Sequence, residues 1–401
     1  MHDRPGARVP AGAHFPMPQS ATMKTRAAIL WTIGAARPYA DSRPLTVEEV
    51  ELDGPGPGEV LLAIRAAGLC HSDLSAIDGV RPRERTPLPI ILGHEAVGEV
   101  LETGAGVDDL VPGDRVVTLF VPSCGQCAMC LEGRPALCVT APQYSGAGTL
   151  ASGAIRFRCR GRPVHHYVGV AAFAEMTVMM RRSLVKIDAD VPTDAAALIG
   201  CAVLTGAGAV FNTARVRPGE SVAVVGLGGV GLSALMGARA AGASDIVAID
   251  VSEPKLALAR ELGATFAVSA SDPACIAKVR GATGGGVHCA FEMAGAAQAM
   301  EIAYQVTRRG GTTIIGSIPA SDVRLPVGHA SVVAEERTIK GSYFGSSVPV
   351  RDVPRYARMV RDGRLPVARI ADRRVGLGDL NAAFDALAEG RTMRQILVPG
   401  L

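Results

Sequence analysis

Residues 221–250, SVAVVGLGGVGLSALMGARAAGASDIVAID, decide the fold of the domain that contains them. The stretch reads as an apolar strand, a glycine turn, a helix and a second strand. In this setting G-x-G-x-x-G allows a tight turn, close backbone approach to a pyrophosphate and close packing of helix on strand. The pyrophosphate would lie at the positive end of the helix. We therefore expect a dinucleotide at the turn formed by Gly226, Gly228, Gly229, Val230 and Gly231.

Asp250 ends the second strand of this unit and lies 19 residues beyond Gly231. A carboxylate there would accept hydrogen bonds from the adenosine ribose and repel a 2′-phosphate, which favours NAD over NADP. The simpler alternative is that Asp250 only caps the turn that follows.

The segments around this unit predict two domains. After Asp250, the runs KLALARELGA (255–264), TFAVSA (265–270), VHCAFEMAG (287–295) and GGTTIIGSI (310–318) continue the strand–helix alternation of a parallel, doubly wound sheet. Before it, from residue 24 to about 117, short apolar runs broken by turns predict an antiparallel β-domain. We predict a catalytic domain over 23–202, a nucleotide domain over 203–342 and a return to the first domain over 343–401. Residues 1–22, rich in Pro and Gly, are predicted to be a disordered tail or the product of an early start codon, with the folded chain beginning at Met23.

Composition excludes several classes of function. The 401 residues are 48% apolar and 20% charged, with a formal net charge of only +3, so nucleic-acid binding has little electrostatic support. No apolar run reaches the roughly 18–20 residues of a membrane span, and the start has no secretory signal. Nine cysteines, an odd number, with C-x2-C spacing favour metal ligands and free thiols in a reducing cytoplasm.

Four cysteines form the run C-x2-C-x2-C-x7-C within VPSCGQCAMCLEGRPALC (121–138). Four thiolates make a closed tetrahedral site suited to Zn²⁺, with no position left for a substrate. We therefore predict a structural zinc, within a lobe over 118–168, held by Cys124, Cys127, Cys130 and Cys138.

Three residues outside this run are candidates for a second, open metal site. Cys70 stands in GLCHSDL, His94 in ILGHEAVGEV and Cys201 in LIGCAVLTGAG. Two cysteines and one histidine would leave the fourth zinc position open for water or substrate. Spacing does not select this trio, because a cysteine with apolar neighbours is usually a small buried hydrophobe.

These motifs, together with KGSYFG (340–345) and MRQILV (393–398), resemble the zinc-dependent alcohol dehydrogenases of the medium-chain dehydrogenase/reductase family. They follow the family order over residues 23–401. The resemblance implies an α/β fold with a GroES-like antiparallel catalytic domain and a Rossmann coenzyme domain. It also implies bound NAD, a homo-oligomer (dimer or tetramer), a structural zinc on the four clustered cysteines, and a catalytic zinc on Cys70, His94 and Cys201. Cys159, Cys275 and Cys289 match no ligand position.

The resemblance also implies roles for residues beside the ligands. His71 and Arg394 match contacts to the cofactor pyrophosphate, and Lys255 is placed with them; solvated surface positions are the alternative. Ser72 matches the hydroxyl that passes the alcohol proton outward. Ser75 stands where many relatives have a histidine, so water or the ribose would complete the relay. Carboxylates that orient the metal ligands are matched by Asp73 and Glu95.

Phe120 and Tyr167 match positions that line the alcohol pocket, although both could be core residues. The resemblance then implies that zinc acts as a Lewis acid on a primary aliphatic or aryl alcohol, such as benzyl alcohol, whose hydride passes to NAD to leave the aldehyde. The polyol-oxidising branch of the family tends to have Glu as the third zinc ligand. Cys201 at that position therefore argues against polyol substrates.

Two other functions are alternatives to this one. The segment 139–168 resembles the glutathione-dependent formaldehyde dehydrogenases, yet Pro142 and Arg81 replace an Arg and an acid of that branch. The other alternative is a non-catalytic protein that binds NAD and zinc.

Overall fold

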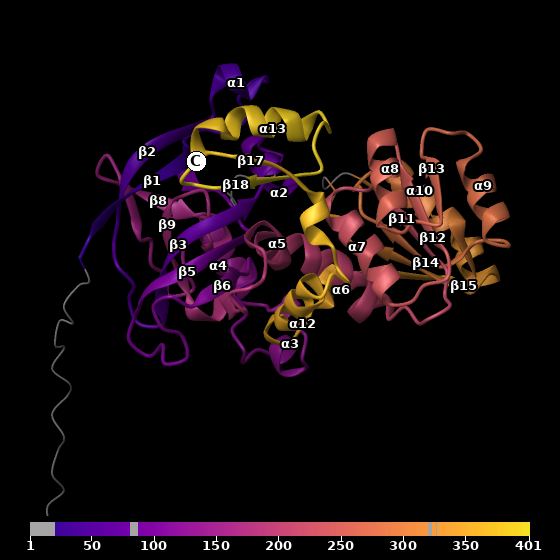
Figure 1. The fold of residues 1–401 in the computed structure, drawn as a ribbon, viewed down its shortest axis with the longest axis horizontal. Coiled ribbons are helices and arrows are strands. Elements are labelled where there is room, and N and C mark those ends of the chain that lie inside the picture. The colour runs from indigo at the N-terminus through magenta and orange to yellow at the C-terminus, as the bar shows by residue number, and fades with distance from the viewer. Residues whose placement is uncertain (1–20, 81–86, 320–322, 326) are drawn as a thin grey trace, which may run out of the picture.

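The computed structural model describes residues 21–80, 87–319, 323–325 and 327–401, and the chain forms two lobes joined by a long central helix (Figure 1). Residues 1–20 of the predicted tail, and Arg81, lie outside the described residues.

The first lobe begins with a closed β-barrel. Its strands, in order around the barrel, are β1 (Met23–Leu30), β2 (Leu45–Leu52), β7 (Phe157–Cys159), β8 (Arg162–His166) and β4 (Ile90–Ile91). The predicted zinc lobe over 118–168 is therefore shorter than expected, because residues 157–166 belong to the barrel. Phe157 and Val164 are fully buried in the barrel core, so apolar burial rather than metal binding orders this segment.

A mainly antiparallel sheet completes this lobe and brings distant parts of the chain together. Its strands are β10 (Leu184–Lys186), β6 (Arg115–Thr118), β5 (Ala96–Thr103), β3 (Glu59–Gly68), β18 (Arg394–Leu397) and β17 (Ala371–Val375), with β9 (Met176–Met180) also paired to β3. The C-terminal segment thus returns to the first lobe, where β18 pairs with β3 (Figure 1). The neighbouring strands β5, β3 and β18 bring His94, Cys70 and Arg394 to the same end of the sheet.

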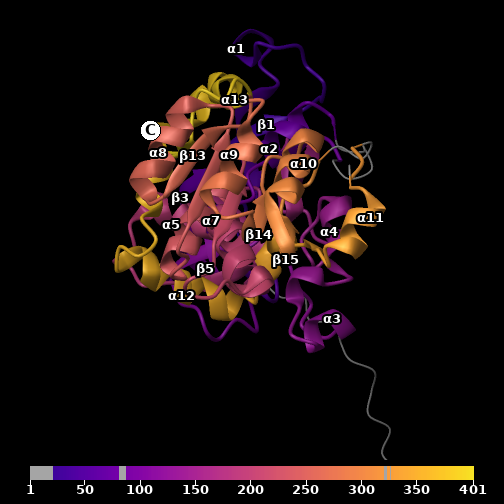
Figure 2. The ribbon, with the colours of Figure 1, turned by 90° about the vertical axis from the view of Figure 1, so that its right-hand side faces the viewer.

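The second lobe is the predicted parallel sheet, which confirms the Rossmann expectation. Its strand order is β13 (Phe266–Ser269), β12 (Ile246–Asp250), β11 (Val222–Val225), β14 (Val287–Glu292), β15 (Thr307–Ile315) and β16 (Thr338–Gly341). Figure 2 looks onto this lobe, with helices around the sheet: α7 (Gly229–Ala240), α8 (Glu253–Leu262), α9 (Cys275–Ala282) and α10 (Ala297–Val306).

Strand β11 is apolar along its whole length because helices cover both faces of the sheet. Val222 and Val224 pack with α7 and α8, whereas Ala223 and Val225 pack with α9 and α10. All four side chains are 2% exposed or less.

A continuous helix, Thr193–Ala214, joins the two lobes. It consists of α5 (Thr193–Leu198) and α6 (Leu204–Gly208), each followed by a π-helical stretch, Ile199–Val203 and Ala209–Ala214. The boundary predicted at 202/203 falls inside this helix, so no linker separates the lobes. Within the described residues this is the one helix long and apolar enough to cross a membrane, but most of it is buried inside the protein as a core element.

The remaining helices are short, apart from α12, which packs against the central helix. They are α1 (Tyr39–Ser42), α2 (His71–Ile77), α3 (Ala128–Leu131), α4 (Ala141–Ala147), α11 (His329–Ala334), α12 (Pro349–Arg361) and α13 (Leu380–Ala388).

Candidate metal and cofactor site

The three candidate ligands of the open metal site meet at the junction of the lobes. Cys70 follows β3, His94 precedes β5, and Cys201 lies in the π-helical stretch of the central helix, a feature common at functional sites. The two thiols and a ring nitrogen of His94 lie within 4.8 Å of one another. Their residues are 8%, 3% and 7% exposed, respectively. The trio that spacing could not select is therefore assembled by the fold.

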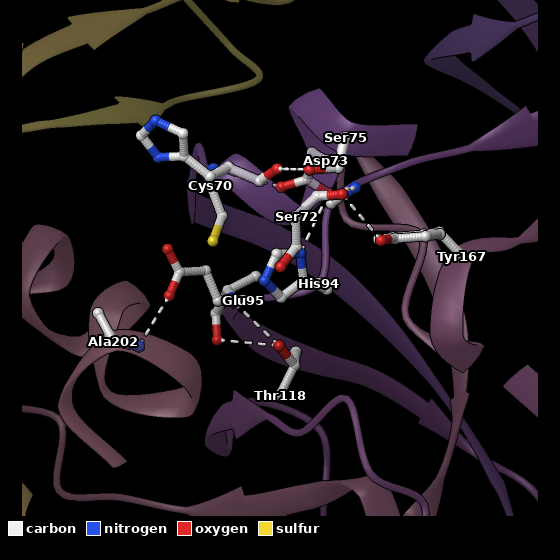
Figure 3. Close-up of polar contacts among 12 residues, drawn as sticks. Cys70, Ser72, Asp73, Ser75, His94, Glu95, Thr118, Tyr167 and Ala202 are labelled. Carbon is white, nitrogen blue, oxygen red and sulfur yellow. Dashed lines mark hydrogen bonds and ion pairs between the residues drawn. The ribbon is translucent and has the colours of Figure 1, made fainter. Parts of the chain in front are cut away.

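The hydrogen bonds of His94 show how its ring is held. Nδ1 lies 3.0 Å from Oδ1 of Asp73, which also accepts a bond from the amide of Gly93, while Oδ2 accepts from the amide of Cys70 (Figure 3). Nε2 is buried and has no hydrogen-bond partner among the described residues. An uncommitted buried nitrogen beside two thiols fits a zinc ion, because neutral imidazole and thiolates are its usual ligands.

The charges of this cluster also favour a cation. Burial lowers the pKa of His94, but the negative charges of Asp73 and Cys70 outweigh burial and raise it well above the usual value. A hydrogen bond from Cys201 holds the pKa of Cys70 well below that of an ordinary thiol. The site therefore attracts positive charge, which a divalent metal would supply in place of a proton.

Replacement of Asp73 with asparagine is expected to weaken zinc binding at this cluster by roughly 10- to 100-fold, because the carboxylate fixes the ring and raises its basicity. Titration of the metal against a chelator of known affinity measures the change. Asp78→Asn is the matched control: Asp78 ends the same helix and pairs with Arg37, away from the cluster. Equal zinc affinity in the wild-type and Asp73→Asn proteins would contradict the assigned role.

Glu95 joins the metal cluster to the C-terminal strand and the central helix. Oε2 accepts a hydrogen bond of 3.1 Å from the amide of Ala202, the residue after Cys201, as Figure 3 shows. Oε1 accepts from the Arg394 guanidinium. Burial raises the pKa of Glu95 to about 7, against the opposing charge of Arg394. This buried pair, which sequence reasoning missed, holds two candidate ligand segments in place.

The four clustered cysteines lie in a surface lobe around α3. All four sulfur atoms lie within 4.8 Å of one another, which accommodates the roughly 3.8 Å edge of a tetrahedron with Zn–S bonds of about 2.3 Å. The amides of Cys124 and Cys127 donate to the sulfurs of Cys138 and Cys124, at 3.2 and 3.3 Å. A hydrogen bond from the backbone of Gln126 contributes most to lowering the pKa of Cys124 to about 6, which favours the thiolate that a metal needs.

The glycine turn of 226–231 has the geometry that its sequence predicts. Gly226 has a φ of +91°, and a Cβ on Gly231 would lie 1.8 Å from the carbonyl oxygen of Gly226, so neither position accepts a side chain. Asp250 accepts hydrogen bonds from the amides of Leu227, at 2.6 Å, and Ser252, at 2.9 Å. Its carboxylate therefore lies beside the turn, and it also caps the segment that follows.

Of the three residues predicted to contact the cofactor, His71, Lys255 and Arg394, the last lies directly beside this turn. The side chain of Arg394 lies against Gly229, where a Cβ would be 3.2 Å from its Nε, and this Nε is buried without a hydrogen-bond partner among the described residues. Burial of its ring lowers the pKa of His71; the charge of Cys70 opposes this shift, and those of Arg394 and Lys255 add to it. Of the three, Arg394 has a role that the sequence did not predict, because it also pairs with Glu95.

Aromatic rings form one wall beside His94. The ring of Phe120 lies 5.6 Å from that of His94, and the ring of Tyr167 lies 6.0 Å from it. The ring of Phe344 lies 4.4 Å from that of Phe120 in a tilted arrangement, and the ring of Tyr343 lies 6.5 Å from that of Phe120. The KGSYFG motif contributed to the family resemblance, but the sequence predicted no role for Tyr343 or Phe344. Their only signal was two adjacent aromatic residues in a family motif.

The predicted relay residues lie on α2, on the same side as this wall. The hydroxyl of Tyr167 donates a 3.1 Å hydrogen bond to the carbonyl of Ser72, which fixes the peptide that carries the Ser72 hydroxyl (Figure 3). Ser75 instead donates to the carbonyl of His71 at 2.8 Å. Its hydroxyl is thus tied to its own helix rather than directed outward.

Comparison with known proteins agrees with this architecture. Residues 56–189 match the alcohol dehydrogenase GroES-like domain, and residues 229–362 match the zinc-binding dehydrogenase domain. An alcohol dehydrogenase zinc-binding domain protein from Burkholderia ambifaria is 33% identical, with a TM-score of 0.88 over 94% of this chain and 100% of that one. Benzyl alcohol dehydrogenase from Acinetobacter calcoaceticus is 28% identical, with a TM-score of 0.86 over 94% of this chain and 99% of that one.

A zinc-binding dehydrogenase from Sinorhizobium meliloti, solved with bound NADP, is 25% identical, with a TM-score of 0.75 over 94% of this chain and all of that one. Fold and site together define a zinc-binding dehydrogenase with a GroES-like and a Rossmann domain. The chain belongs to the zinc-dependent alcohol dehydrogenases of the medium-chain dehydrogenase/reductase family.

Proposed function

We propose that this protein oxidises primary alcohols, aliphatic or aryl, to aldehydes with NAD, and that it holds one catalytic and one structural zinc. The observation that carries the proposal is the open three-donor cluster of Cys70, His94 and Cys201 between an aromatic wall and the glycine turn. The similarity to a benzyl alcohol dehydrogenase adds support for an aryl substrate.

The residues around the cluster have distinct tasks in this reaction. A bound zinc would supply Lewis-acid polarisation of the alcohol oxygen. Phe120 and Tyr167 would present apolar ring surface beside His94 to the body of the substrate. Ser72 can accept the alcohol proton and donate its own, because a hydroxyl does both. With Ser75 bonded to its own helix, the proton would leave through water or the cofactor ribose.

The test is a panel of primary, secondary and aryl alcohols, each assayed with NAD and then with NADP. We expect NADH formation with primary alcohols, benzyl alcohol among the best. Exclusive use of NADP, as the bound cofactor of the Sinorhizobium relative illustrates, would contradict the proposed cofactor. Dominant oxidation of S-hydroxymethylglutathione would contradict the substrate class, although Pro142, an exposed residue, offers no cation for that adduct.

Replacement of Asp250 with alanine is expected to lower kcat/KM for NAD by roughly 10- to 100-fold, because a charge-assisted hydrogen bond to the ribose is lost. The same change is expected to raise kcat/KM for NADP, since repulsion of a 2′-phosphate ends. Steady-state kinetics with both cofactors measure the two effects. Asp250→Asn is the companion variant: it removes the charge and keeps one amide oxygen, which can accept from Leu227 or from Ser252 but not from both. If the ratio of kcat/KM for NAD to kcat/KM for NADP were unchanged in both variants, Asp250 would have no role in cofactor choice and would only cap the segment that follows it.

Compartment and assembly complete the proposal. All nine cysteines are free thiols, seven of them in the two clusters, which supports a reducing cytoplasm. We also propose a homo-oligomer, because β16 is an edge strand with exposed residues and Val333 and Leu131 are large exposed apolar side chains. Light scattering at several protein concentrations measures its size.

A further inference from the structure

A cavity of about 420 Å³ lies between the cysteine lobe and the carboxyl edge of the parallel sheet. Arg134 and Leu137 line it from the lobe, and Ser317 and Ile318 line it from the segment after β15. Tyr343 closes the side that faces the aromatic wall. Most of the lining is apolar, so the cavity suits the body of an organic molecule rather than a small ion.

Arg134 is the one charged residue among the described residues that line this cavity. Its side chain is exposed, and no carboxylate in the described part of the chain lies within ion-pair distance of it. The nearby hydroxyls are already engaged: Ser317 donates to Glu292, and both Ser342 and Ser346 bond to Thr213. Arg134 is therefore the polar group left to meet a ligand.

The cavity lies next to the aromatic wall of the proposed alcohol site, because Tyr343 lines the cavity and also contacts Phe120 of that wall. The ring of Tyr343 lies 6.5 Å from Phe120, and the ring of Phe120 lies 5.6 Å from the candidate ligand His94. The ring contacts of His94 with Phe120 and of Phe120 with Tyr343 thus connect the metal cluster to the lining of the cavity. A substrate whose hydroxyl lies at the cluster would extend past Phe120 and Tyr343 towards Arg134.

We propose that Arg134 selects primary alcohols with a carboxylate at the far end of an apolar body, so that the preferred substrates are hydroxy acids rather than simple alcohols. The inference rests on the proposed oxidation of primary alcohols. A carboxylate fits better than a phosphate dianion, because one guanidinium offers a single charge in the planar fork that matches two carboxylate oxygens. The apolar lining would bury the body between the two polar ends.

The experiment compares matched substrates that differ only in the far end. Benzyl alcohol is paired with para-hydroxymethylbenzoate, and primary alkanols are paired with ω-hydroxy acids of equal length, over increasing chain lengths. Wild-type protein is expected to prefer the acid by about tenfold or more in kcat/KM, the value of one charge-assisted hydrogen bond. The preference should be largest at the one chain length at which the carboxylate reaches Arg134. It should appear as a lower KM for the acid, with kcat similar for the two substrates.

Variants assign the preference to this residue. Arg134→Gln is expected to lose the acid preference and leave the neutral alcohols unchanged, while Arg134→Lys keeps part of it. Arg182→Gln is the matched control, since Arg182 is an exposed cation without an ion pair in the described residues and lies outside the cavity. It should behave as wild type.

Three results would count against the proposal. Neutral alcohols oxidised with no acid preference at any length would overturn this inference and leave the proposed function intact. An acid preference that survives Arg134→Gln would overturn the role of Arg134. Absence of turnover with every alcohol, in protein that retains its zinc, would overturn the proposed function and this inference with it.

Discussion

Replacement of Cys201 with serine is expected to remove one of two zinc ions per chain and to reduce kcat/KM by a factor of about 1,000 or more. The thiolate is one of three protein donors, and a serine hydroxyl does not ionise to replace it. Lewis-acid polarisation is worth several kcal/mol, and each 1.36 kcal/mol corresponds to about tenfold in rate. Metal content by elemental analysis and turnover of benzyl alcohol with NAD measure both effects.

Cys289→Ser provides the control for this experiment. Both thiols are 7% exposed and in core positions, but Cys289 lies on β14 outside either cluster. It should retain two zinc ions and full activity. A Cys201→Ser protein with both ions and full turnover would show that the catalytic site is misassigned. A wild-type protein with one zinc and no alcohol-dependent NADH would favour the non-catalytic alternative.

Replacement of Cys130 with serine is expected to remove the other zinc and to lower Tm by more than about 10 °C, since structural zinc contributes about 10 kcal/mol or more to folding. Burial raises the pKa of Cys130 to about 12, so this thiol needs a cation beside it to ionise. The lobe offers little else to hold it: Leu131 and Val139 are exposed, and α3 is only four residues long. Limited proteolysis should cut within 121–140 faster in the Cys130→Ser protein than in the wild-type protein.

Cys159→Ser tests whether loss of any thiol has this effect. Cys159 is 4% exposed in the barrel and donates to Glu48 at 3.4 Å, a bond that serine can keep. The zinc content and Tm of the Cys159→Ser protein should stay near those of the wild-type protein. A Cys130→Ser protein with an unchanged Tm and an intact lobe would contradict a structural role for the cluster.

The parts of this molecule that were predictable are those specified by local sequence. The glycine turn follows from backbone geometry that only six residues determine, and the parallel sheet follows from buried runs such as VAVV. The four-cysteine cluster has ligand spacings short enough to be read directly. Each of these depends on contacts within one short stretch of chain.

The open site was not predictable in the same way. Cys70, His94 and Cys201 come from three elements, and only the pairing of β3 with β5 and their packing on the central helix bring them together. Without the family resemblance, Cys201 would have remained a buried hydrophobe. No spacing rule connects residues so far apart in the chain.

Arg394 and Phe344 show why the surroundings of the site escape prediction. Arg394 reaches Glu95 because β18 returns to β3 after the whole nucleotide domain has intervened. Phe344 reaches Phe120 through a left-handed backbone, with a φ of +53°, that local propensity disfavours. Gly345 permits this turn, because a Cβ there would lie 2.0 Å from the carbonyl of Leu204. Tertiary contacts override local preference at both positions.

The helix Thr193–Ala214 would link the two proposed binding events, of zinc and of nucleotide. The candidate ligand Cys201 lies on this helix, which packs against α7 of the nucleotide lobe, whereas Cys70 and His94 lie on the β-lobe. Any rotation of one lobe against the other would therefore change the distances among the three candidate ligand atoms, and with them the fit of a metal ion. Thermodynamic reciprocity then requires that whatever nucleotide binding does to metal retention, metal binding does to nucleotide affinity by the same factor.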